Sequence, residues 1–366
     1  MARQRPRGAP HPLSTTEVDA DGARGRFWNH IDRRIQVLEL TLSWRRLRSA
    51  VLTPNASATK MAVRGFQIKD HESQAVLETI GRTFLTGYAA AARARSTDEV
   101  PAELADIPTR FRGFAYEGAA MGFAMLDGLP GGGTRRVAEF LGGAGGDHVY
   151  MAYVGVGWAA ARLPRFLRPR LAAPDPLLRW LALDGYGFHQ AYFHTGRYVD
   201  GQVVDPVAWP VRGAPYARRA VDQGIGRALW FVCGTDPGLV ADRIEEFAEA
   251  RRGDLYAGVG LAAAYAGGAD EKELRTLWDR AGRYRPDVAQ GCAFAAEARL
   301  RADLVVPHVE LATEVLCSMT PEQAAKVCAD HLPAVPDDPA ADARADVPAY
   351  EAWRRAVAAA LVPGTD

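Results

Sequence analysis

The segment over residues 183–198, LDGYGFHQAYFHTGRY, has the greatest concentration of aromatic and ionisable side chains in the chain. An acid and a histidine that lie near one another can take a proton from a substrate and return it. We therefore predict that Asp184 and His189 act as a catalytic proton-transfer pair.

The same segment offers side chains for binding a substrate. Tyr186, Tyr192 and His194 suit the wall of a hydrophobic cavity, although aromatic rings equally suit an ordinary core. His189 and His194 are five residues apart, which puts them on different faces of an ideal helix. Because this is not the HExxH spacing of a helical zinc site, we expect no bound metal.

An internal repeat indicates how these side chains are positioned. A pattern of Gly, any residue, Gly or Ala, a large residue and a small residue occurs six times. The copies begin at Gly118, Gly155, Gly185, Gly224, Gly258 and Gly291, with spacings of 37, 30, 39, 34 and 33 residues. This period is the length of one helix–turn–helix unit. We therefore predict an all-α fold of stacked helical pairs, similar to an α-solenoid, with six glycine-rich first helices.

The repeated glycines call for a physical reason, since each costs about 1 kcal/mol in a helix relative to alanine. Close approach of neighbouring helices supplies one. A dinucleotide site would need GxGxxG between a strand and a helix, and the glycine-rich runs at 131–133 and 142–146 have no Walker lysine. We therefore interpret the glycines as packing residues and expect no cofactor.

Residues that depart from the repeat are candidates for function. The position before the first glycine is occupied by Glu117, Val154, Asp184, Gln223, Ala257 and Gln290. His189 replaces a small residue in the third copy, and Arg227 replaces an apolar residue in the fourth. If the first helices stack, Glu117, Gln223 and Arg227 join Asp184 and His189 along one apolar groove as substrate-binding residues. Alternatively, these polar side chains cap helices or form hydrogen bonds between them.

Composition excludes several classes of protein. Lysine plus arginine and aspartate plus glutamate each number 44, so the net charge is zero and non-specific nucleic-acid binding is not expected. The four cysteines form no CxxC pair, which predicts a reduced, cytoplasmic protein. No run approaches the roughly 18 apolar residues of a membrane helix. The absence of GxSxG argues against a serine hydrolase.

The chain divides into three parts by composition. Residues 1–43 form a basic extension that we expect to be disordered, and residues 44–332 carry the helical repeats. Residues 333–366 are a linker followed by a short helix over 349–361. Scarce strand-like alternation is limited to residues 197–209, which we interpret as a short hairpin or a loop.

Several distinctive segments occur in the same order as in a known bacterial family. They are residues 44–70, 112–122 (RGFAYEGAAMG), 183–189 (LDGYGFH) and 222–230 (DQGIGRALW), with a Pro-His pair at 307–308. On these segments the chain resembles a family of unknown function, DUF1702, whose members are labelled enediyne biosynthesis proteins. The resemblance implies a place in the gene cassette of an iterative polyketide synthase. It supplies no agreed catalytic residues.

Two functions from different classes follow. The leading hypothesis is an enzyme, without a cofactor, that binds a linear polyene or polyyne polyketide in an apolar helical cavity during formation of an enediyne core. The alternative is a non-catalytic helical scaffold that docks the polyketide synthase, another protein of the cassette or a membrane-bound partner. An enclosed cavity would favour the enzyme, and an open concave face would favour the scaffold.

Overall fold

The computed structural model describes residue 53 and residues 55–207, 209–210 and 212–362. The chain divides into Met1–Leu47 and Arg48–Asp366, and all that follows concerns the second unit. The extension predicted over residues 1–43 lies outside the described residues. The described residues contain helices and no strand, so the predicted all-α class is confirmed. None of these helices is long and apolar enough to cross a lipid bilayer.

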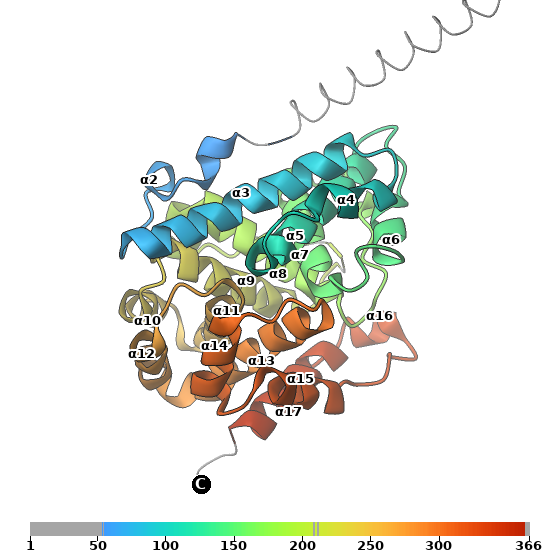
Figure 1. Cartoon of the computed structure of the whole chain (residues 1–366). Coiled ribbons are helices and arrows are strands. Elements are labelled where there is room, and N and C mark those ends of the chain that lie inside the picture. Colours follow the sequence, from blue (N-terminus) through green and yellow to red (C-terminus); the bar gives the residue numbers. More distant parts are fainter. Residues whose placement is uncertain (1–52, 54, 208, 211, 363–366) are drawn as a thin grey trace, which may run out of the picture. The chain divides into compact units, whose positions relative to one another are not determined.

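Seven long helices form the core of this unit. They are α3 (His71–Arg93), α5 (Thr109–Gly128), α7 (Val149–Arg162), α8 (Arg179–Phe193), α9 (Ala217–Val232), α11 (Glu249–Ala266) and α13 (Arg285–Arg301). Each packs against the next in this order, from α3 in blue to α13 in orange (Figure 1). The row also curves, because α11 contacts α3 and α13 contacts α7. The inner faces of these helices therefore surround a common interior.

A second layer covers the later half of the row. It contains α10 (Pro237–Glu245), α12 (Glu271–Ala281) and α14 (Pro307–Cys317), each of which follows a glycine-rich helix and packs against its neighbour in the layer. The earlier glycine-rich helices have no equivalent: α5 is followed by the short helix α6 (Arg136–Leu141), and α7 and α8 by irregular chain. A reciprocal capping box between Asp270 and Glu273 begins α12.

The C-terminal part adds α15 (Pro321–Asp330), the short α16 (Pro339–Asp342) and α17 (Ala349–Leu361). Helix α17 packs against α13 and α15, and the indole of Trp353 donates a hydrogen bond of 2.8 Å to the carbonyl of Cys328. Residues 349–361 therefore belong to the core of this unit. The remaining described helical segments are short: α2 (Met61–Arg64), α4 (Val100–Leu104), η1 (Ala56–Thr59), η2 (Thr97–Glu99), η3 (Arg168–Arg170), η4 (Gly196–Asp200) and η5 (Gly282–Tyr284).

The repeated glycines lie where consecutive helices cross in backbone contact. A Cβ atom added to Gly155 would lie 2.2 Å from the carbonyl oxygen of Glu117 on the preceding helix. The same atom on Gly224 would lie 1.8 Å from the carbonyl oxygen of Asp184. No side chain fits at such distances, so only glycine allows the helices to approach this closely. The glycines therefore occupy helix-packing positions, as their repeated pattern predicts.

The segment after α8 is irregular. It begins with the π-helical turn η4 (Gly196–Asp200), and its described residues up to the start of α9 form no strand. Of the two structures considered for residues 197–209, a hairpin or a loop, the described residues have the loop.

Candidate functional site

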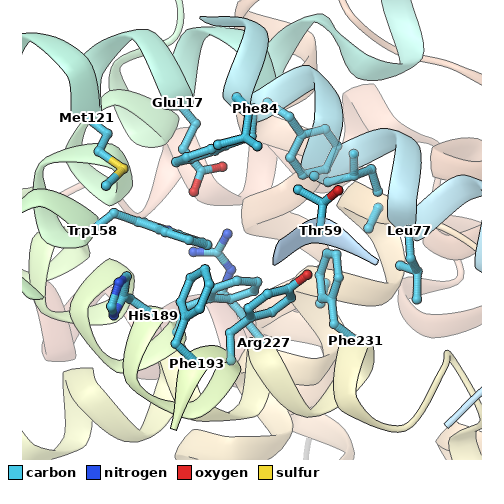
Figure 2. Close-up of a pocket in the computed structure, with 18 of the residues that line it drawn as sticks. Thr59, Leu77, Phe84, Glu117, Met121, Trp158, His189, Phe193, Arg227 and Phe231 are labelled. Carbon is cyan, nitrogen blue, oxygen red and sulfur yellow. The ribbon is translucent and has the colours of Figure 1, made fainter. Parts of the chain in front are cut away.

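The interior of the helix row contains a narrow, mainly apolar pocket, which we call the central pocket (Figure 2). Its walls come from η1 and from the inner faces of α3, α5, α7, α8, α9 and α11. The space in which the centre of a water molecule fits is about 60 Å³. The pocket is therefore suited to a slender ligand and too small for a bulky one.

One register of the repeat supplies much of the pocket wall. The large residues of the first five copies are Met121, Trp158, Phe188, Arg227 and Leu261, and all five line the pocket. The side chain four residues earlier in each helix shares the same face. This explains why Glu117, which precedes Met121 by four residues, also reaches the pocket.

Aromatic rings dominate the wall around Trp158. Its ring centroid lies 4.6 Å from that of Phe84 and 5.1 Å from that of Phe188. Tyr192 stacks on Phe188 with centroids 5.8 Å apart, and Phe66 packs edge-on against Tyr192. Such flat, polarisable surfaces favour planar unsaturated ligands over saturated ones of similar volume.

Glu117 brings an ionisable group to this apolar surrounding. Its side chain is 3% exposed, extends into the pocket and forms no hydrogen bond with any described residue (Figure 2). Burial raises the pKa of Glu117 to about 7, an effect that nearby Arg227 opposes and nearby Asp184 reinforces. The indole N–H of Trp158 also opposes the rise, although its geometry falls short of an ordinary hydrogen bond. Glu117 therefore gains and loses its proton near neutral pH.

Arg227 is the buried cation of the pocket, whose lining also includes the exposed Arg162. Its guanidinium forms a buried ion pair with Asp184 and lies 5.3 Å from the ring centroid of Phe188. Although burial acts to lower the pKa of Arg227, the carboxylates of Asp184 and Glu117 outweigh burial and raise it. Arg227 therefore stays charged, and Asp184 holds it beside Glu117.

His189 is uncharged in this surrounding. Burial lowers the pKa of His189 to about 3, and its Nδ1 atom lies 3.3 Å from Oε1 of Gln190. Asp184 lies on the same helix but pairs with Arg227, so the two predicted catalytic residues do not bond to each other. His189 lines the central pocket, whereas Asp184 is buried behind Arg227.

The other predicted residues are distributed between different places. Tyr192 lines the central pocket, whereas Tyr186 lines a separate cavity. Gln223 is buried and donates a hydrogen bond of 2.8 Å to the hydroxyl of Tyr216. His194 is exposed at the end of α8. The structure thus brings together Glu117, His189, Tyr192 and Arg227.

Two pocket residues with an unpaired hydrogen-bond donor, Trp158 and Tyr265, are not among the site residues predicted from the sequence. Trp158 occupies the large position of the second copy, so the repeat register was a signal for it. Tyr265 lies outside the repeated pattern, and its buried hydroxyl has no hydrogen-bond partner among the described residues. Burial raises the pKa of Tyr265 to about 12, so the hydroxyl keeps its proton. Both side chains offer a hydrogen-bond donor to a ligand.

The described residues contain no group of three or more histidine, cysteine, aspartate or glutamate side chains arranged to hold a metal ion. The four cysteines are buried and free.

Comparison with known proteins gives one family and no function. A family model described as "Protein of unknown function (DUF1702)" matches residues 43–361. No curated protein and no solved structure matches the chain.

Proposed function

This chain belongs to the DUF1702 family, and we propose that it binds a linear, conjugated polyene or polyyne in the central pocket and moves a proton along it. One observation carries the proposal: the Glu117 carboxyl, whose pKa is about 7, faces a narrow aromatic pocket without a hydrogen bond to any described residue. An acid with this pKa serves as both proton acceptor and proton donor at neutral pH.

The pocket matches a thin unsaturated chain in both shape and chemistry. The rings of Phe84, Trp158 and Phe188 offer flat faces to a conjugated ligand, and the available space is narrow. A mainly apolar pocket between the helices also supports this ligand-binding role over the alternative scaffold, which predicts an open concave face without a pocket.

If the ligand is a polyene with a conjugated carbonyl group, Glu117 and Arg227 have complementary roles. The Glu117 carboxylate removes a proton from an sp³ carbon bonded to the end of the double-bond system that is conjugated with that carbonyl. The C–H electron pair moves through the chain to the carbonyl oxygen, and the Arg227 guanidinium stabilises the resulting enolate. Glu117 then returns the proton to a different carbon. The double bonds shift with no net oxidation, so the step consumes no oxidant or reductant.

This assignment differs from the one based on the sequence. Proton transfer moves from Asp184 and His189 to Glu117, because Asp184 is committed to Arg227 and His189 stays neutral down to acidic pH. His189 and Tyr192 then contribute to the pocket wall.

The family resemblance supports a biological setting for this chemistry. We place the protein in the cytoplasm, beside the iterative polyketide synthase of an enediyne cassette, acting on the linear product before the core matures. An isomerisation that consumes no cofactor would adjust double-bond positions in such a product.

Deuterium incorporation into a ligand tests the proton transfer separately from ligand binding. The probe is the N-acetylcysteamine thioester of a conjugated tetraenoic acid with a terminal methyl group, incubated with protein in D₂O and analysed by mass spectrometry. The wild type is expected to introduce deuterium into carbon positions of the probe. Glu117→Gln should abolish this incorporation while the probe still quenches protein fluorescence, because the amide keeps the shape of the carboxyl.

Separate variants test where the probe binds. Trp158→Ala should weaken probe binding at least about fivefold, the effect typical of removing a buried aromatic contact. Phe166→Ala is the control, since Phe166 is 78% exposed and away from the pocket. Equal deuterium incorporation by wild type and Glu117→Gln would overturn the proton-transfer role. Unchanged binding by Trp158→Ala would overturn the location of the ligand.

A further inference from the structure

A second cavity shares no lining residue with the central pocket. Its walls come from Tyr186 of α8, the first half of α9, Arg251 of α11 and the start of the loop after α7, together with Tyr198 and described residues over 203–215. The space for the centre of a water molecule is about 650 Å³, compared with about 60 Å³ in the central pocket. We call it the arginine cavity.

The charge of this cavity is strongly positive. Its lining contains five arginines, Arg165, Arg168, Arg212, Arg218 and Arg251. Two acids, Asp205 and Asp222, also line it. The described lining therefore has a formal excess of three positive charges, although the whole chain is neutral. A concentration of one sign in a concave surface raises the local concentration of the opposite ion.

Both acids are already paired. Asp222 accepts hydrogen bonds from Arg251, the shortest of 2.6 Å, and lies 3.7 Å from Arg218. Asp205 accepts a hydrogen bond of 2.9 Å from Arg197 and another from the hydroxyl of Tyr198. These contacts occupy both carboxylates. Arg165 adds an electrostatic attraction to Asp205 that helps to lower the pKa of this acid, and neither Arg168 nor Arg212 forms an ion pair with a described residue.

Three arginines are available to a ligand. Neither Arg165 nor Arg212 forms an ion pair with a described residue. The Nε atom of Arg168 donates to the carbonyl of Leu163, and its guanidinium lies 5.2 Å from the ring centroid of Tyr186. Stacking on Tyr186 fixes the orientation of this guanidinium while its terminal nitrogens form no hydrogen bond with any described residue.

The rest of the cavity is apolar. Val203, Val207, Trp209 and Ile225 line it together with the arginines. A ligand that fills the cavity therefore combines a compact group of high negative charge with a hydrophobic body. Phosphate fits the charged part better than a carboxylate does, because its several oxygens accept hydrogen bonds from more than one guanidinium.

We propose that the arginine cavity binds a phosphate-bearing small molecule with a hydrophobic body, its phosphate held by Arg165, Arg168 and Arg212. This site is separate from the central pocket and goes beyond the proposed proton transfer. It also gives Tyr186 a role: the residue supports Arg168 at the second site rather than lining the pocket for the polyene.

Calorimetric titration with octyl phosphate tests the proposal. The wild type is expected to bind this probe more tightly than inorganic phosphate, and not to bind octanol, because both the charge and the hydrophobic body contribute. A triple variant, Arg165→Gln, Arg168→Gln and Arg212→Gln, should lose at least about tenfold in affinity for octyl phosphate. The matched control is Arg275→Gln, which removes an exposed arginine on α12.

The outcomes separate this site from the central one. Thermal melting and deuterium exchange into the polyene thioester should be unchanged in the triple variant, so either proposal can fail alone. No binding of octyl phosphate to the wild type, or equal binding to wild type and triple variant, would overturn the site. Arginine-dependent sedimentation with phosphatidic acid vesicles, without binding of monomeric octyl phosphate, would assign the cavity to a membrane lipid instead.

Discussion

Two buried clusters of charge lie inside the helix row, and they differ in how completely their acids are paired. The pocket cluster consists of Glu117, Asp184 and Arg227. The C-terminal cluster consists of Arg219 on α9, Asp254 on α11, and Glu351 and Arg354 on α17; its two acids are each about 3% exposed or less. Both clusters place ionised groups where burial makes an unpaired charge costly.

The C-terminal cluster is saturated. Arg354 donates hydrogen bonds to Asp254 (2.8 Å), Glu351 (3.0 Å), Tyr216 (2.9 Å) and Gln290 (2.9 Å). Arg219 also binds both acids, and Arg355 binds Glu351, so each acid has at least two arginine partners. These bonds link α17 to α9, α11 and α13.

The pocket cluster has two acids and one arginine. Arg227 is bonded to Asp184, which leaves the Glu117 carboxyl without a hydrogen bond to any described residue. Both acids of the C-terminal cluster are bonded to arginines, whereas Glu117 is not. Asp287, which lies beside the C-terminal cluster, also forms no ion pair with a described residue, but it is only half-buried. This difference between the two clusters supports the proposal that the C-terminal cluster stabilises the structure and that the pocket cluster takes part in proton transfer.

Removing Arg354, the more buried arginine of the C-terminal cluster, is expected to have the largest effect. Arg354→Met should lower the free energy of unfolding by about 3–5 kcal/mol, because it leaves Asp254 and Glu351 buried with fewer partners. Urea denaturation followed by circular dichroism measures the change.

Arg355→Met is the matched control for this variant. Arg355 binds the same Glu351, but its side chain is 60% exposed. Its loss should cost less than about 1 kcal/mol. If the two variants were equally stable, the C-terminal cluster would have no special structural role and the comparison would lose its basis.

Glu117, the unpaired acid of the pocket cluster, should lower the free energy of unfolding at high pH, so its removal should stabilise the protein there. The folded pKa of Glu117 is about 7, compared with an ordinary value of 4.5, so the folded state binds its proton more tightly than the unfolded state does. The resulting stabilisation is complete below pH 4.5 and is lost as the pH rises through 7. At 1.36 kcal/mol per pKa unit, the loss is about 3 kcal/mol.

Glu117→Gln removes this pH dependence. The difference in unfolding free energy between Glu117→Gln and wild type should shift in favour of the variant by about 3 kcal/mol between pH 4 and pH 8. Other titrating groups cancel in the difference, which denaturant titrations at several pH values provide. A difference that stays constant over this range would show that Glu117 is paired and ionised, like the acids of the C-terminal cluster.

The sequence predicts part of this contrast. The repeat marks which positions share a face, so the departures at Glu117 and Arg227 identify two members of the pocket cluster before the structure is known. It also predicts that the glycines pack helices together. Both properties depend on local spacing, which the helical period fixes.

What the sequence does not predict depends on contacts between distant segments. The pairing of Asp184 with Arg227, rather than with His189, depends on how α8 and α9 cross. The return of α11 to α3, which brings Tyr265 into the pocket, depends on the curvature of the whole row. A single repeat period contains no information about that curvature.

Two buried tyrosines, one beside each cluster, provide a further comparison, with the smallest expected effects on stability. The Tyr216 hydroxyl, beside the C-terminal cluster, accepts hydrogen bonds from Arg354 and Gln223. The Tyr265 hydroxyl, beside the pocket cluster, has no partner among the described residues. Tyr216→Phe should therefore lower the free energy of unfolding by about 1–2 kcal/mol, whereas Tyr265→Phe should raise it by up to about 1 kcal/mol.

Ligand binding should show the reverse order, with Tyr265→Phe affected and Tyr216→Phe unaffected. Tyr265→Phe loses a donor aimed at the ligand, so it should weaken binding of the polyene thioester while the protein becomes more stable. Tyr216→Phe should leave that binding unchanged. Denaturant titrations and fluorescence quenching on the same preparations measure both properties. A loss of stability in Tyr265→Phe equal to that in Tyr216→Phe would mean that its hydroxyl is already satisfied in the free protein, and that Glu117 alone distinguishes the pocket cluster.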